Sequence, residues 1–178
     1  MGNLSNNIAQ IVRKALVSTF ELDSVDHRIL EILQKEGRLS NQELADRVAL
    51  SPAPCLRRVR ALEKAGVIRR YAALLEPRKV GLGMMSFITV KLEKKGKVPA
   101  EAFARAVRSW PEVVSCYAMT GETDYFLRIF VEDLDHYTRF LMDRLLKHEG
   151  VADVKSNIVL EAIKDTTALP LDQVASHR

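Results

Sequence analysis

The first half of the chain contains three short segments whose apolar residues recur at the spacing of a helix. The first segment can be capped by Asp23 or Ser24 and stops at Gly37, because these side chains accept hydrogen bonds from first-turn amides and glycine readily ends a helix. Its core-facing residues are Ile29, Leu30, Ile32 and Leu33. The pattern predicts one amphipathic helix between these two signals.

The second and third segments follow at close intervals. Ser40 and Glu43 form an S-x-x-E capping box, which predicts a short second helix. The third helix begins at Ser51, with Pro52 in its first turn, and ends at Gly66. The core-facing residues of the two helices are Leu44, Val48, Cys55, Val59 and Leu62. Because the turn between them is so short, the three segments match a helix-turn-helix.

Residues 67–75 read as extended chain, with Arg69 and Arg70 near a turn. A hairpin at this place would be the wing of a winged helix-turn-helix. The dipeptide Glu76-Pro77 and the glycines that flank Leu82 then break both helical and strand patterns. We therefore place a domain boundary there.

The second half of the chain alternates between strand-like and helix-like patterns. The predicted order is strand, helix, strand, strand, helix, strand, over residues 84–92, 99–109, 113–120, 125–131, 134–147 and 154–162. This order predicts a ferredoxin-like domain, with a four-stranded antiparallel sheet and both helices on one face. The other face carries apolar residues and lacks a helix, so a second copy of the chain is expected to cover it as a homodimer.

The predicted fold class is α+β, a winged helix-turn-helix followed by a ferredoxin-like β-α-β-β-α-β domain. The first residues add a short helical stripe formed by Leu4, Ile8, Ile11 and Ala15. The predicted divisions are 1–22, an N-terminal extension; 23–76, the winged helix-turn-helix domain; 77–83, a linker; 84–165, the ferredoxin-like domain; and 166–178, a C-terminal tail.

The charged residues are distributed unevenly along the chain, and this distribution indicates a binding partner. The whole chain of 178 residues carries a net charge of +4, whereas residues 51–71 contain six Lys and Arg against one Glu. A basic patch on a nearly neutral body indicates a polyanionic partner that is contacted at one place. Because this segment holds the third helix, double-stranded DNA is the expected partner.

The core stripe of the third helix turns its basic residues outward. Arg57, Arg60 and Lys64 lie opposite the stripe, and Arg58 lies at its flank. A solvated charged helix is the alternative, but the tight turn before the helix and the basic segment after it favour DNA binding. The predicted DNA-binding residues are Ser51, Ala53, Pro54, Arg57, Arg58, Arg60, Lys64, Arg69 and Arg70.

These residues resemble a known family. The motifs SPAPCLRRVRALEKAGVI and TGETDYFL, within a likeness that runs from about Glu21 to Lys164, are similar to the leucine-responsive regulatory protein/AsnC (Lrp/AsnC) transcription regulators. The resemblance implies a sequence-specific DNA-binding protein whose assembly and DNA binding respond to an amino-acid effector. It also implies dimers that assemble further, to octamers.

The turn TGETDY lies between two predicted strands. Gly121 can adopt positive φ, amides after it can converge on an anion, and Glu122 and Asp124 can pair with an ammonium group. On spacing alone a solvated hairpin turn is the better explanation of these residues. The resemblance implies that the effector binds here, between dimers. The effector-binding residues predicted on that basis are Met119, Thr120, Gly121, Glu122, Thr123, Asp124 and Tyr125.

The chain departs from the family pattern at two places, and the first of them concerns effector identity. Members often carry an aromatic residue where this chain has Thr123, and Leu-Pro where it has His148 and Glu149. The resemblance therefore implies an amino-acid effector without identifying it.

Other classes of function find little support. Cys55, Cys116 and four scattered histidines show no metal-ligand or disulfide spacing, and no catalytic motif or cofactor is indicated. No apolar run reaches the length of a membrane span, so a cytoplasmic, nucleoid-associated protein is expected. An effector-independent, chromatin-like DNA-binding protein is the alternative to an effector-responsive regulator.

Overall fold

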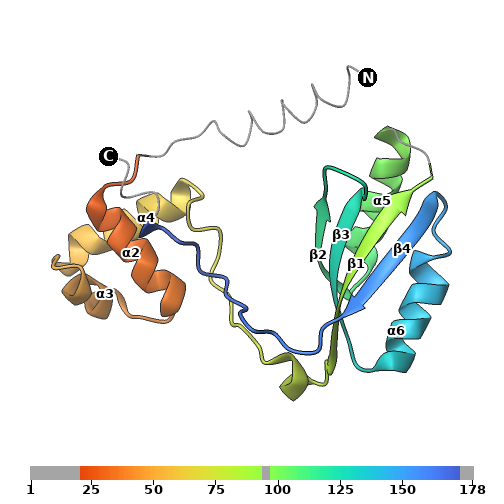
Figure 1. Cartoon of the computed structure of the whole chain (residues 1–178). Helices are drawn as coiled ribbons and strands as arrows, with labels where there is room; N and C mark the ends of the chain where they lie inside the picture. The colour runs from red at the N-terminus through yellow and green to blue at the C-terminus, as the bar shows by residue number, and fades with distance from the viewer. Residues whose placement is uncertain (1–20, 94–96, 173–178) are drawn as a thin grey trace. The chain divides into compact units, whose positions relative to one another are not determined.

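The structure is a computed structural model that describes residues 21–93 and 97–172. The chain divides into two compact units, which are described separately (Figure 1). The first unit contains the described residues up to Ala73 and a second segment that begins at Thr166; we call it the DNA-binding unit after the function predicted for its third helix. The second unit spans Leu74–Asp165, and we call it the effector unit after the site predicted at Gly121. The apolar stripe predicted before residue 21 lies outside the described residues.

Three helices build the DNA-binding unit: α2 (Ser24–Lys35), α3 (Asn41–Arg47) and α4 (Pro52–Lys64). Of the two caps that the sequence allowed for α2, Asp23 is the one observed, in a reciprocal capping box with Asp26; the predicted capping box of Ser40 and Glu43 caps α3. Buried aliphatic residues from all three helices form one core: Ile29, Leu30, Leu44, Ala45, Val48, Cys55 and Leu62. The helix-turn-helix is therefore held by a small core without aromatic residues.

Beyond α4, residues 67–76 form neither helix nor strand. Val67 and Ile68 pack against the core of the DNA-binding unit. The Tyr71 hydroxyl donates a hydrogen bond to the Glu63 carboxylate at 3.1 Å, which ties this segment back to α4. Burial, together with that carboxylate, raises the pKa of Tyr71 to about 12. In place of the hairpin expected as a wing, residues 67–76 form an irregular segment that is held to the unit by these contacts.

The effector unit is a four-stranded antiparallel sheet in the order β2-β3-β1-β4. Its strands are β1 (Met84–Leu92), β2 (Val113–Ala118), β3 (Tyr125–Val131) and β4 (Val151–Ile158). Helices α5 (Lys97–Ser109) and α6 (Leu134–Phe140) lie on one face (Figure 1). This is the predicted ferredoxin-like arrangement.

Alternate residues of β1 and β3 enter the core between sheet and helices. Ile88, Leu127 and Ile129 are fully buried there, and Phe103 and Phe140 reach them from α5 and α6. Period-two alternation places every second residue of these strands on the opposite face of the sheet. The core thus fixes which side chains the sheet presents on its uncovered face.

Several boundaries differ from the sequence prediction: α5 begins at Lys97 rather than residue 99, β2 ends at Ala118 rather than residue 120, and β4 ends at Ile158 rather than residue 162. Two further shifts have a visible backbone cause. The last strand begins at Val151 rather than residue 154, because Gly150 reverses the chain with φ +91° and strand pairing starts directly after it. Helix α6 ends at Phe140 and continues as a π-helical turn, Leu141–Leu145, closed by a hydrogen bond from Leu146 N–H to the Leu141 carbonyl. Neither shift changes the topology.

Candidate DNA-binding and effector-binding surfaces

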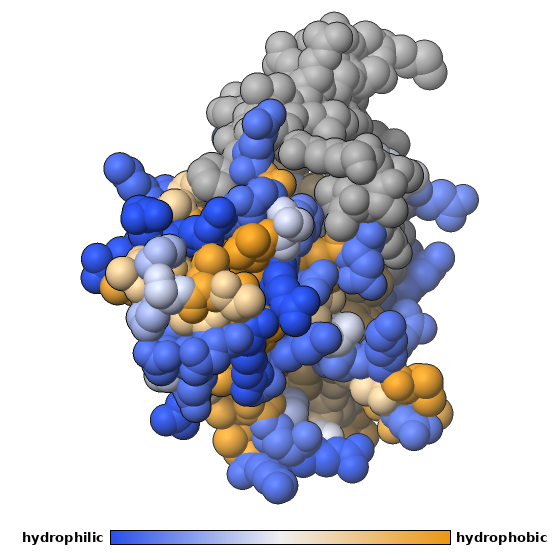
Figure 2. All heavy atoms as spheres, turned by 90° about the vertical axis from the view of Figure 1, so that its left-hand side faces the viewer, coloured by the Kyte–Doolittle hydropathy of each residue, from blue (hydrophilic) through white to orange (hydrophobic). Residues whose placement is uncertain are grey.

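The outward face of α4 is basic and free of internal partners. Within the part of the chain that the structure describes, no ion pair involves Arg57, Arg60, Lys64, Arg69 or Arg70, and all five side chains are exposed. The space-filling view, turned toward the side where α2, α3 and α4 are drawn, is largely hydrophilic with small apolar areas (Figure 2). Unpaired cations on one helix face suit contact with phosphates and base edges.

The beginning of α4 is also open. Ser51 occupies the N-cap position with extended backbone, yet its side chain makes no capping hydrogen bond. Ser51 and Ala53 are exposed, whereas Pro54 is half-buried. Since the Ser51 hydroxyl has no role inside the helix cap, it is available to a phosphate or a base edge.

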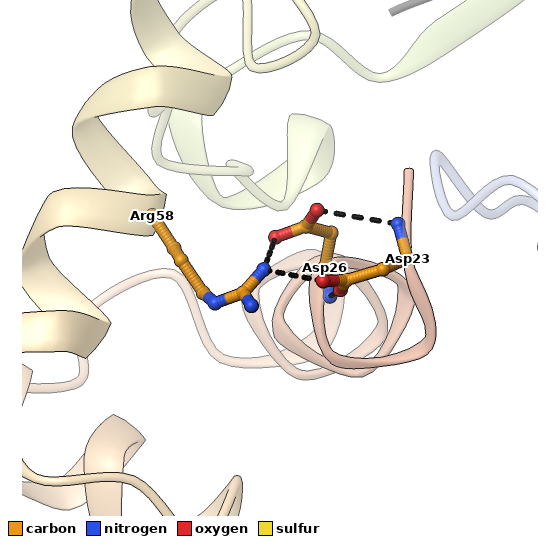
Figure 3. Close-up of polar contacts among 3 residues, drawn as sticks. All are labelled: Asp23, Asp26 and Arg58. Carbon is orange, nitrogen blue, oxygen red and sulfur yellow. Dashed lines mark hydrogen bonds and ion pairs between the residues drawn. The ribbon is translucent and has the colours of Figure 1, made fainter. Parts of the chain in front are cut away.

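One predicted DNA-binding residue, Arg58, instead forms ion pairs within the DNA-binding unit. Arg58 Nη1 donates to Asp23 Oδ2 at 2.7 Å and to Asp26 Oδ1 at 2.8 Å, as Figure 3 shows. The Asp26 amide and Arg58 both donate to the Asp23 carboxylate, and together they lower its pKa. Arg58 thus braces α4 against the first turn of α2, and we remove it from the set of free cations.

The turn between α3 and α4 sets the direction of the recognition helix. Ala49 lies in the left-handed region with φ +55°, and the Leu50 amide donates to the Ala45 carbonyl. The Asn41 side-chain amide donates to the Pro52 carbonyl at 2.8 Å and links the starts of the two helices. These contacts hold α4 without using its outward face.

The turn between β2 and β3 has the backbone that its sequence predicted. Gly121 has φ +114°, and a Cβ added there would meet no atom within 4 Å. Met119, Thr120 and Glu122 are exposed, whereas Thr123 is half-buried. In a single chain the turn is therefore an open surface.

The next two residues of the predicted effector set are engaged within the unit. Asp124 Oδ2 accepts a hydrogen bond from the Leu92 amide at 2.8 Å, and the Asp124 amide donates to the Val90 carbonyl. Tyr125 is buried in the core, where its hydroxyl donates to the Ala100 carbonyl at 3.2 Å. Asp124 thus links the turn to β1. Tyr125 packs in the core next to the turn and does not line an open site within a single chain.

The uncovered face of the sheet is partly aromatic. Phe87 and Phe126 stack with ring centroids 5.2 Å apart, and Tyr117, which pairs with Phe126 across the strands, is 57% exposed. Arg128 lies over the Phe130 ring at 5.9 Å. Aromatic residues of this kind on an uncovered sheet face are typical of an interface.

The described residues contain neither a cluster of metal ligands nor a helix that could span a membrane. Across 21–93 and 97–172, no three His, Cys, Asp or Glu side chains come together as metal ligands. None of the helices in those same ranges is long and apolar enough to cross a membrane.

Comparison with protein families assigns both units. The model of the winged helix-turn-helix DNA-binding family matches residues 22–69, and that of the Lrp/AsnC ligand binding domain matches residues 85–169. The leucine-responsive regulatory protein of Escherichia coli is 40% identical over 149 residues, which are 84% of this chain and 91% of the relative. The chain belongs to the Lrp/AsnC family.

Solved structures of Lrp/AsnC proteins share the fold. A transcriptional regulator from Neisseria meningitidis, in complex with L-Met, is 53% identical with a TM-score of 0.83, over 86% of this chain and 99% of that one. An AsnC family transcriptional regulator from Agrobacterium tumefaciens is 40% identical with a TM-score of 0.81, over 85% and 99%. The predicted family and fold class are confirmed, and these relatives are transcription regulators rather than enzymes.

Sequence reasoning missed two features of this Lrp/AsnC chain. Leu56 is 37% exposed on α4 between Ala53 and Arg60, where its spacing of three and four residues from them was a readable signal. Leu171 packs against the core of the DNA-binding unit from the C-terminal segment. No local pattern signals that second contact, because its partners are more than a hundred residues away.

Proposed function

We propose that this DNA-binding transcription regulator is sequence-specific, forms homodimers that assemble to octamers at the nucleoid, and responds to a small amino acid. The outward face of α4 carries this proposal: it presents Arg57, Arg60 and Lys64 without internal partners. A regulator needs such a face to read DNA, and α4 presents it on a rigid core.

The positions along α4 suggest different roles at the DNA. Ala53 and Leu56 near its start offer apolar surface for thymine methyl groups, and Arg57 and Arg60 can reach guanine edges. Residues at the N-cap of α4 and beyond Arg60 contact phosphates, which fix position without reading sequence. The proposed phosphate-contacting residues are Ser51, Lys64, Arg69 and Arg70.

The Gly121 turn is the proposed effector site. Its positive-φ backbone offers amides to a carboxylate, and Glu122 and Asp124 offer negative charge to an ammonium group. A small zwitterion needs more than one exposed turn to enclose it, so a second dimer is proposed to complete the site. The L-Met bound to the Neisseria relative makes methionine the first effector to test.

The uncovered sheet face is the proposed dimer interface. Phe87, Phe126 and Tyr117 would be covered by the same face of a second copy, because a twofold interface pairs one patch with itself. Such a dimer presents two α4 helices to two half-sites about one helical turn apart, or a multiple of it.

Selection from a random duplex pool tests sequence-specific binding. We expect one enriched motif with twofold symmetry, and a binding constant that falls steeply with salt because basic residues displace counterions from phosphates. Equal affinity for enriched and random duplexes at every salt concentration would contradict sequence specificity.

Calorimetry with L-methionine and L-leucine tests the effector site. Asp124→Asn keeps an acceptor for the Leu92 amide and removes only the charge, so it is the informative variant; Glu122→Gln is its matched neighbour. We expect at least one of the two to weaken binding about tenfold or more, because a desolvated ammonium loses its partner. If no amino acid binds the wild type while DNA binding is intact, the chain is an effector-independent architectural protein.

A further inference from the structure

The C-terminal segment of the chain docks on the DNA-binding unit. The Gln34 side-chain amide, on α2, makes two hydrogen bonds with the backbone of Leu169: Nε2 donates to the carbonyl at 3.2 Å, and Oε1 accepts from the amide at 2.6 Å. Two bonds between one side chain and one peptide position fix both place and direction, much as a neighbouring strand would.

The residues around Leu169 orient the segment. Thr166 Oγ1 accepts from the Ala168 amide, and the Leu171 amide donates to the Leu169 carbonyl across Pro170 at 3.0 Å. Pro170 has a fixed φ, so this three-residue turn is prepared in advance. It directs Leu171 onto the core of the DNA-binding unit, where Leu171 is partly buried.

The two chain segments that connect the effector unit to the DNA-binding unit leave the effector unit at neighbouring positions. Chain enters β1 at Met84 and leaves β4 after Ile158, which pairs with Ser86. The Val159 amide donates to the Met85 carbonyl at 2.9 Å, so the two connections begin side by side. The returning connection, residues 159–165, spans about 25 Å at most when fully extended.

We propose that residues 166–172 are a strap that, with the connection before β1, fixes the orientation of the DNA-binding unit on the effector unit of the same chain. One connection leaves a tethered domain free to rotate, whereas two connections restrict that rotation when they are anchored on different helices of the domain, here Tyr71 on α4 and Leu169 on α2. The strap thereby sets where α4 is held when dimers form.

Distance measurements within one chain test the strap without DNA. Dyes are placed at Arg38→Cys and Arg105→Cys, one exposed position in each unit, in a Cys116→Ser background; Cys55 is buried. The labelled chain is diluted into excess unlabelled protein, so that each assembly carries one labelled copy. Single-molecule energy transfer then reports the distance between the two units.

We expect one narrow distribution for the wild type and a broad one for Gln34→Ala and for Leu171→Ala. Leu169→Ala is the matched control, because the side chain is 68% exposed and only the backbone of this residue bonds to Gln34. Gln34→Ala leaves a helix-favouring residue on α2, so it tests the strap even where Leu171→Ala destabilises the core. Distributions that stay equally narrow in both variants would overturn the proposal.

A second measurement reports the consequence for DNA and rests on the proposed dimer. On duplexes with two half-sites at varied spacing, the wild type should prefer one spacing, and Gln34→Ala should bind all spacings within about twofold of each other while its affinity for a single half-site is unchanged. A spacing preference retained by Gln34→Ala would overturn the strap. Absence of the preference in the wild type itself would count against the dimer, and the energy-transfer result separates the two failures.

Discussion

The outward face of α4 and the turn at Gly121 differ in how much of a binding site one chain supplies. The basic side chains of α4 are exposed, unpaired and held by a packed core, so the surface is complete within a single chain. The Gly121 turn is open, and one carboxylate oxygen of Asp124 is already bound to the Leu92 amide. Under the proposed function, one chain therefore supplies the whole DNA-contacting face, whereas effector binding requires a second dimer.

Among the variants considered, a charge introduced on the uncovered sheet face should have the largest effect, because this face is the proposed dimer interface. Tyr117→Asp places a charge in the proposed interface, on a side chain already 57% exposed, so the single chain should still fold. We expect the dimer to dissociate at least about a hundredfold more readily, since a buried unpaired charge costs several kcal/mol. Sedimentation measures this shift.

The matched control is Leu134→Asp, which changes an equally exposed leucine at the start of α6, away from the open face. This control should sediment as the wild type does. A Tyr117→Asp protein that remains a tight dimer would show that another surface holds the two copies together.

Substitution of the exposed arginines on α4 tests whether this face binds DNA. Arg57→Ala and Arg60→Ala should each weaken binding to the preferred duplex by about 1–3 kcal/mol, because each removes a proposed base contact. Arg38→Ala changes an exposed arginine of the same unit that is not part of α4, so it serves as the control and should bind as the wild type does. Mobility shifts on preferred and random duplexes measure the difference; unchanged affinity in both α4 variants would exclude this face.

Substitution of Arg58, on the same helix, should reduce the stability of the protein without reducing its affinity for DNA. Arg58→Ala leaves Asp26, whose side chain is 10% exposed, without its ion pair, so we expect a loss of about 1 kcal/mol of stability, discounted for the exposed partners. Half-site affinity of the folded protein should stay the same. Denaturant unfolding followed by titration with a single half-site separates the two quantities.

Acid should weaken the same brace. The folded-state pKa of Asp23 lies below its ordinary value, so the stability it contributes is present above the unfolded pKa and is lost as pH falls through the folded pKa, below about 4. Asp23→Asn should therefore reduce the dependence of unfolding on pH in this range. An identical pH dependence in wild type and variant would show that the ion pair contributes nothing measurable.

The smallest expected effect is at the turn before α4. Ala49→Gly should stabilise the DNA-binding unit by about 0.5 kcal/mol, because glycine removes the strain of φ +55° but adds freedom to the unfolded chain. Ala45 is buried in the core and makes a poor control, whereas exposed Ala61→Gly, in the middle of α4, should destabilise by about 1 kcal/mol. Thermal unfolding of both variants gives opposite signs if the turn is strained as described.

The parts that sequence predicted well are governed by local rules. The capping box of Ser40 and Glu43, the limits of β1 and β3, and the positive φ of Gly121 follow from a few neighbouring residues. The ion pairs of Arg58 and the docking of Leu171 depend on residues distant in sequence, so helical periodicity placed Arg58 on a solvent-facing flank and left the tail unassigned. A single sequence carries no signal for such pairings.

Titration of L-methionine into wild type and Tyr117→Asp by calorimetry tests the central claim most directly. The account predicts saturable heat from the wild type and none from Tyr117→Asp at the same concentrations, while both proteins bind a single DNA half-site equally well. L-Leucine is titrated in parallel so that the choice of effector does not decide the outcome. A dissociated Tyr117→Asp chain that binds either amino acid as tightly as the wild type would contradict the claim that assembly completes the effector site.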